Sequence, residues 1–241
     1  MQLLISVKNV GEALLAMDAS ADLIDLKDPS IGALTALDLA ISEKIVRAIN
    51  GRAHVSGTVG EVHATLDDLL RDIQARVDLG LYAIKMCVTP LFAEANFIKE
   101  MRRFTSKGTK LIAVFFADSA VDLTLLSSLQ QAGFYGAMLD TQNKQFSLLE
   151  AQTAASLKKF IHDCAQYQLV SGLAGSLKPQ HVEFLLELNP TFIGFRGGIC
   201  ENFDRKSAIS TLKIEQIKKM LLKHNKMGAK ALKSLVLALH N

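Results

Sequence analysis

The segment Leu23–Leu34, LIDLKDPSIGAL, places two charges in a short apolar strand that runs directly into a turn with proline and glycine. Side chains of a strand alternate between its two faces, so Asp25 and Lys27 point to the same side. An unpaired charge in a strand built for burial is costly unless it finds a partner or loses its charge. Two interpretations remain open: an Asp25–Lys27 ion pair or a strand end that reaches water, and a lysine amine held near neutrality for covalent chemistry.

Apolar segments typical of strands alternate with amphipathic segments typical of helices along the chain. The predicted strands cover residues 3–7, 23–27, 53–57, 82–88, 111–116, 135–140, 168–172 and 191–195. Eight strands, each followed by a helix at intervals of roughly 25 to 30 residues, predict an α/β fold, a closed (β/α)8 TIM barrel with parallel strands. An open doubly wound sheet is the alternative, but it usually carries a GxGxxG turn where this chain has Val7-Lys8-Asn9.

Capping residues and helix breakers predict the helix boundaries in the second half of the chain. Helices are expected to begin at Pro90, at Asp118 and at Lys178-Pro179, and single helices are expected over residues 148–164 and 207–222.

The sequence predicts one barrel domain over residues 1–222 and a C-terminal amphipathic helix over residues 223–241. Leu232, Leu235, Val236 and Leu239 form an apolar stripe, and lysines surround it. We expect this helix to pack on the barrel or on a neighbouring subunit of a homo-oligomer. A basic amphipathic segment for an acidic partner or a membrane surface is the alternative.

Composition excludes several classes of protein. A net charge of +3 gives no basic field for nucleic acid, and no apolar run approaches the length of a membrane span. The three cysteines are far apart and the six histidines lack the spacing of metal ligands, so we expect no disulfide framework, no metal and no cofactor. The N-terminus lacks the pattern of a signal peptide, and a cytoplasmic location is expected.

Charged residues lie late in three of the predicted strands, where the active site of such a barrel is found. These are Asp25 and Lys27, Lys85, and Asp140 with Lys144 just beyond it. Two lysines at one barrel mouth lower each other's pKa, so one could attack a carbonyl as a neutral amine while the other moves protons. Alternatively, Lys27 and Lys144 are rim lysines in water, and Asp140 caps a turn.

His54 shares a face of the third predicted strand with Ser56 and is a further candidate for the site. A lone histidine carries little information, so we favour a hydrogen-bonded core histidine.

The loops after the last two strands are rich in glycine: SGLAGS over residues 171–176 and GFRGG over residues 194–198. Barrels of this kind commonly bind phosphate there through backbone N–H groups. The candidate phosphate-binding residues are Gly172, Gly175, Ser176, Arg196, Gly197 and Gly198. The alternative is that the glycines only permit tight turns.

The stretches IDLKDPSIGAL, YAIKM, GAMLDTQNK, SGLAGSL and GFRGGIC together resemble the (5-formylfuran-3-yl)methyl phosphate synthase family of methanofuran biosynthesis, known from methanogens and methylotrophic, one-carbon-using bacteria. The resemblance extends from Leu3 to about Cys200. It implies a lyase that joins two molecules of glyceraldehyde 3-phosphate into 4-(hydroxymethyl)-2-furancarboxaldehyde phosphate, with loss of phosphate and water. One departure is Thr35-Ala36, where the family more often has a further Gly-Ala, so the loop over the site could differ.

The resemblance also implies roles for individual residues. Lys27 would form the Schiff base and Lys85 would accept the proton, while Asp25, Asp140 and Lys144 match further charged positions of the active site. Two other functions stay open: a class I aldolase for another sugar phosphate, and a non-catalytic barrel that binds a phosphate ligand.

Overall fold

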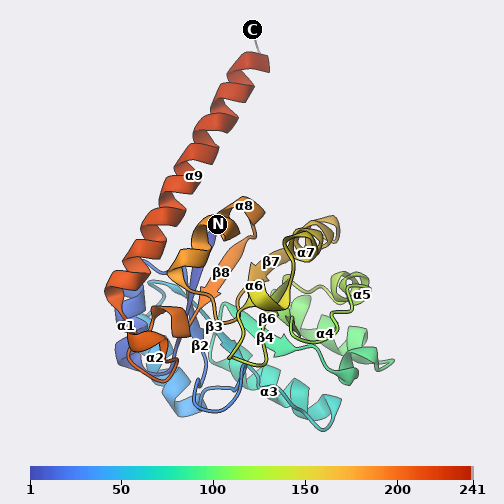
Figure 1. Ribbon diagram of the computed structural model, residues 1–241. Coiled ribbons are helices and arrows are strands. Elements are labelled where there is room, and N and C mark those ends of the chain that lie inside the picture. The colour runs from blue at the N-terminus through green and yellow to red at the C-terminus, as the bar shows by residue number, and fades with distance from the viewer. Residues whose placement is uncertain (240–241) are drawn as a thin grey trace.

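Eight parallel strands close into a barrel in which each strand pairs with the next and β8 pairs with β1 (Figure 1). The strands are β1 (Gln2–Val7), β2 (Leu23–Leu26), β3 (His54–Thr58), β4 (Ala83–Cys87), β5 (Leu111–Phe116), β6 (Gly136–Asp140), β7 (Val170–Leu173) and β8 (Phe192–Phe195). This computed structural model describes residues 1–239, with side chains through residue 226. The predicted (β/α)8 TIM barrel is confirmed.

Helices follow the strands and surround the barrel, and the last and longest helix extends away from it (Figure 1). They are α1 (Val10–Asp18), α2 (Leu39–Ile49), α3 (Leu66–Asp78), α4 (Phe97–Thr105), α5 (Leu125–Gln131), α6 (Leu148–Ala151), α7 (Ala154–Gln166), α8 (Val182–Leu188) and α9 (Thr211–Leu239). Asn9 and Asp38 cap α1 and α2 with their side chains.

Strand alternation produces two apolar cores. Within β5, Leu111, Ala113 and Phe115 pack outward against the helices. Ile112 and Val114 point inward, with Leu4 and Met138, and fill the barrel. The charged side chains of the strand ends belong to this inward face, so they lie above an apolar floor.

Several predicted helix boundaries are wrong. Pro90 begins a short 3₁₀ turn, Pro90–Ala93, and Pro179 begins another, Pro179–His181; in both places the α-helix starts later. Asp118 does not cap α5; its carboxylate accepts hydrogen bonds from the N–H groups of Gln142 and Asn143 instead. The predicted helix 148–164 is interrupted at Gln152, because Thr153 caps α7 as a new helix.

The C-terminal segment forms one helix. α9 begins at Thr211 and continues without interruption through the expected boundary at residue 222 (Figure 1). Its first turns are fixed to the barrel by the buried Ile214 and Ile217 and by the ion pair of Lys218 with Asp22 at 2.6 Å. The apolar stripe predicted for residues 232–239 lies outside the range whose side chains are described. Among the helices described, none has the length and apolar character needed to cross a membrane.

Candidate active site

The carboxyl ends of the strands hold the five charged residues that the sequence singled out. Lys27, Lys85, Asp140 and Lys144 line one cavity of about 670 Å³, and Asp25 forms an ion pair with Lys85. The side chain of Lys85 is 1% exposed and that of Asp25 is fully buried. The volume falls within the range of about 300–1,000 Å³ that is usual for small-molecule sites.

Asp25 forms an ion pair with Lys85, and their Oδ2 and Nζ atoms are 2.5 Å apart. The Asp25–Lys27 ion pair, one of the alternatives that the sequence left open, is therefore wrong: Lys85 reaches Asp25 from β4, two strands away. The hydroxyls of Ser6 and Ser56, which stand beside Asp25 in the register of β1 and β3, donate hydrogen bonds to the same carboxylate at 3.1 and 2.8 Å. Burial lowers the pKa of Lys85 from its ordinary value, against the attraction of Asp25, and the charge of Lys27 lowers it further.

The Asp25–Lys85 ion pair predicts that a single variant is less stable than the corresponding double variant. Lys85→Met should lower the free energy of unfolding by about 3–5 kcal/mol, because it leaves the Asp25 carboxylate buried without a counter-charge. The double variant Asp25→Asn/Lys85→Met should recover most of that loss. Urea unfolding measures both, with Lys99→Met on the exposed face of α4 as a control. A double variant no more stable than Lys85→Met would contradict this account.

Asp140 is the centre of a second charged group. Its Oδ1 atom accepts hydrogen bonds from Lys144 Nζ at 2.6 Å and from the Thr141 N–H at 2.8 Å, and its Oδ2 atom is 3.6 Å from Lys27 Nζ. Burial alone would raise the pKa of Asp140, but the charges of Lys144 and Lys27 outweigh it and hold the pKa at about 2. The carboxylate of Asp140 is therefore ionised at neutral pH. Burial lowers the pKa of Lys144 to about 8.

Of the three lysine amines, that of Lys27 has the fewest close polar contacts. Lys85 and Lys144 each donate to a carboxylate at hydrogen-bond distance, whereas the Nζ atom of Lys27 makes no hydrogen bond among the side chains described and only the 3.6 Å contact with Asp140. Lys27 is also buried, with a side chain 7% exposed, and it faces the cavity. Its amine can thus meet a bound molecule without first breaking a close hydrogen bond.

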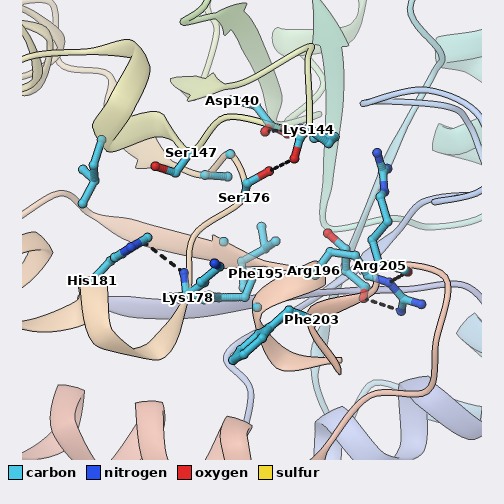
Figure 2. Close-up of a pocket in the computed structure, with 18 of the residues that line it drawn as sticks. Asp140, Lys144, Ser147, Ser176, Lys178, His181, Phe195, Arg196, Phe203 and Arg205 are labelled. Atoms are coloured by element: carbon cyan, nitrogen blue, oxygen red, sulfur yellow. Dashed lines mark hydrogen bonds and ion pairs between the residues drawn. The ribbon is translucent and has the colours of Figure 1, made fainter. Parts of the chain in front are cut away.

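The glycine-rich loop after β7 reaches the cavity at Gly175 and Ser176, and the loop after β8 reaches it at Gly197 and Gly198. Gly175 has a φ of +112°, and a Cβ atom there would lie 2.9 Å from the Thr141 nitrogen, so the turn requires glycine. The Ser176 hydroxyl donates a hydrogen bond to the Lys144 carbonyl at 3.0 Å, as Figure 2 shows. This bond connects the loop to the charged group around Asp140.

Two of the predicted phosphate-binding residues have other roles. Gly172 lies within β7, where a Cβ atom would come 2.2 Å from the ring of Phe192, so it serves the packing of the barrel. The guanidinium of Arg196 forms an ion pair with Glu12 of α1 and donates further hydrogen bonds to three backbone carbonyls. Its donors are used to hold the β8 loop on the barrel, so its side chain is not available to a phosphate.

The prediction for His54 is wrong in both of its forms. His54 is the first residue of β3, at the amino end of the barrel, opposite the cavity. Its ring is exposed and stacks on Tyr82 with a centroid distance of 3.8 Å. It is neither a residue of this site nor a core histidine.

Sequence reasoning missed the cavity residues that come from loops. Ser147, Lys178, His181, Phe203 and Arg205 all line the cavity and are labelled in Figure 2. The Lys178 N–H donates to His181 Nδ1 at 3.2 Å, and burial lowers the pKa of His181. None of these residues stands on a strand, so strand alternation gives no signal for them. Within the part of the chain that the structure describes, no cluster of His, Cys, Asp and Glu is arranged to hold a metal ion.

The family model described as 4-HFC-P synthase matches residues 3–218. The chain belongs to this family. Among relatives of the 4-HFC-P synthase family, a provisionally named (5-formylfuran-3-yl)methyl phosphate synthase of Methylorubrum extorquens is 36% identical over 216 residues, which cover 89% of each chain. The (5-formylfuran-3-yl)methyl phosphate synthase of Methanocaldococcus jannaschii is 29% identical over 86% of this chain and 93% of its own. Membership in a family of synthases makes the protein an enzyme.

Solved structures show the same fold at low sequence identity. Phosphoribosyl anthranilate isomerase from Thermus thermophilus aligns with a TM-score of 0.64 and 15% identity. The alignment covers 92% of this chain and 99% of the isomerase. 3-Hexulose-6-phosphate synthase from Salmonella typhimurium aligns with a TM-score of 0.60 and 18% identity. The alignment covers 93% of this chain and 100% of that synthase.

Proposed function

We propose that the protein joins two molecules of glyceraldehyde 3-phosphate into (5-formylfuran-3-yl)methyl phosphate, with loss of phosphate and water, for a methanofuran-type cofactor. The observation that carries the proposal is the pair of lysine amines in one cavity, Lys27 and Lys85, each next to a different carboxylate. The names of the relatives support the product. The sequence resemblance supports the substrate.

The first step would be attack of the Lys27 amine on the aldehyde of one triose phosphate. Loss of water then gives an iminium, which draws electrons from the neighbouring carbon and makes its proton acidic. The ionised carboxylate of Asp140, 3.6 Å from Lys27 Nζ, would stabilise the iminium charge.

Lys85 would move protons between the carbon atoms and the leaving groups. Burial lowers the pKa of Lys85 from its ordinary value, which makes loss of its proton easier, and Asp25 holds the ammonium form in place when it is present. The backbone of the loops at Gly175 and Gly197 would bind a substrate phosphate.

Product identification tests this proposal. Incubation with glyceraldehyde 3-phosphate alone should release inorganic phosphate and give a conjugated furan aldehyde with its own ultraviolet absorbance. Borohydride should trap an adduct that peptide mapping places on Lys27. A sugar bisphosphate without phosphate release would indicate the aldolase alternative instead. If the incubation gives no product and borohydride traps no adduct, the proposal is refuted.

We expect turnover to depend on pH through the titration of Lys144. Its ammonium loses its proton as the pH rises through about 8, and Asp140 then loses its closest counter-charge, so turnover should fall with an apparent pKa of about 8. Lys144→Arg keeps the positive charge and should move this decline to higher pH, even if the maximum rate is lower. Turnover from pH 6 to 10 measures both. An unchanged decline in Lys144→Arg would assign the titration to another group.

A further inference from the structure

Arg205 enters the cavity from the loop between β8 and α9. Phe203 of the same loop also lines the cavity, and the side chain of Arg205 is half-buried. Figure 2 shows Arg205 on one side of the cavity, with Lys178 and His181 on the opposite side. The backbone of Arg205 lies beside Gly197 of the loop after β8, but its guanidinium contacts Gly32 of the loop after β2. Ser176 of the glycine-rich loop after β7 lies away from Arg205 (Figure 2), so this loop and the guanidinium could contact different groups.

The guanidinium of Arg205 has unused hydrogen-bond donors. A guanidinium carries five N–H donors, yet within residues 1–226 that of Arg205 makes one hydrogen bond, from Nη2 to the carbonyl of Gly32 at 2.7 Å. The carboxylates of Asp140, Glu61 and Asp28 influence the guanidinium of Arg205 electrostatically. Among the described side chains, however, no carboxylate oxygen lies within 4.0 Å of its nitrogen atoms. Arg196, nine positions earlier, is fully hydrogen-bonded and paired with Glu12.

The Gly32 contact gives Arg205 a defined orientation. The loop after β2 is itself held in place, since the Gly32 N–H donates to Thr35 and the Leu34 N–H donates to Glu61 at 2.6 Å. One side of the guanidinium is thereby fixed to this loop, and its other donors remain for the cavity. A planar pair of N–H donors in a partly desolvated site matches the oxygens of a phosphate.

We propose that Arg205 binds a substrate phosphate at a subsite separate from the glycine-rich loop after β7, so that the cavity holds two phosphate groups at once. This inference rests on the proposed function, since a condensation of two triose phosphates brings two phosphates into one cavity. Arg205 also replaces Arg196 as the arginine that meets the substrate. The cavity volume of about 670 Å³ has room for two such small molecules.

Binding of sn-glycerol 3-phosphate tests the subsite without any chemistry, because this molecule has the phosphate of the substrate and no carbonyl. Calorimetric titration of the wild type should give two sites per chain. Arg205→Gln should leave one site and weaken the other by about tenfold to a hundredfold, the usual effect of losing a charged hydrogen-bond pair. Arg205→Lys should lie between the two, because it keeps the charge and loses the fork.

Lys206→Gln is the matched control: it removes the same charge from the next position of the same loop, where the side chain is exposed and outside the cavity lining. It should bind like the wild type. Trapping of unphosphorylated glyceraldehyde on Lys27 by borohydride provides a second measurement, and Arg205→Gln should leave it unchanged. If Arg205 only fixed the Gly32 loop, this trapping would fall together with phosphate binding.

The results separate this inference from the proposed function. Two glycerol 3-phosphate sites that become one in Arg205→Gln support the subsite even if glyceraldehyde 3-phosphate yields no furan. Two equal sites in Arg205→Gln, a single site in the wild type, or equal losses in Lys206→Gln would each overturn it, whatever product the enzyme makes.

Discussion

Lys27→Ala is expected to abolish furan formation, with kcat lower by about 10⁶-fold, the scale seen when a covalent catalyst loses its nucleophile. The amine that would form the iminium is absent, and neither other lysine can replace it. Lys85 is held 2.5 Å from Asp25 and Lys144 2.6 Å from Asp140. Turnover of glyceraldehyde 3-phosphate and borohydride trapping measure the loss.

The folded state should tolerate this substitution, which separates a chemical effect from a structural one. Asp140 keeps its hydrogen bonds from Lys144 and Thr141 when Lys27 is removed, so it is not left as a buried unpaired charge. The midpoint of urea unfolding should therefore stay close to that of the wild type. Lys99→Ala, an exposed lysine of α4, is the control for activity. Residual turnover within a hundredfold of wild type would refute a Schiff base on Lys27.

Lys85→Arg is expected to be nearly as harmful as Lys85→Ala, with turnover lower by about 10²-fold to 10⁴-fold, the usual contribution of general acid–base catalysis. Arginine keeps the positive charge opposite Asp25, but its guanidinium stays protonated across the working pH range and cannot pass a proton on. Turnover of both variants is the measurement.

Imine trapping and stability distinguish the ways in which Lys85→Arg could fail. An arginine variant that still forms the Lys27 adduct but makes no product would place Lys85 after imine formation. One that forms neither would place Lys85 before it. Because arginine is larger than lysine in a fully enclosed position, urea unfolding must show that the variant folds. Turnover within a few-fold of wild type would reject the proton-transfer role.

The sequence alone determined the barrel and the level at which its charges lie. Alternation of side chains along a strand is a property of the local backbone, so the inward direction of Asp25 and Lys85 can be read from a few neighbouring residues. Caps are equally local, since Asn9 and Asp38 each accept a hydrogen bond from the backbone N–H three residues later. The prediction that three lysines and two aspartates meet at one end of the barrel needed only the topology of eight parallel strands.

Only the tertiary structure decided which charges pair. Asp25 is two residues from Lys27 in the sequence, yet its partner is Lys85, because the barrel brings the lysine of β4 to the aspartate of β2 across Ser56 of β3. Likewise, Arg196 and Arg205 are only nine residues apart in the sequence, yet their guanidinium groups have different partners. Glu12 of α1 neutralises one, while the other meets a single carbonyl. Ion pairs and loop contacts depend on distances between segments far apart in the chain, and strand periodicity carries no information about those distances.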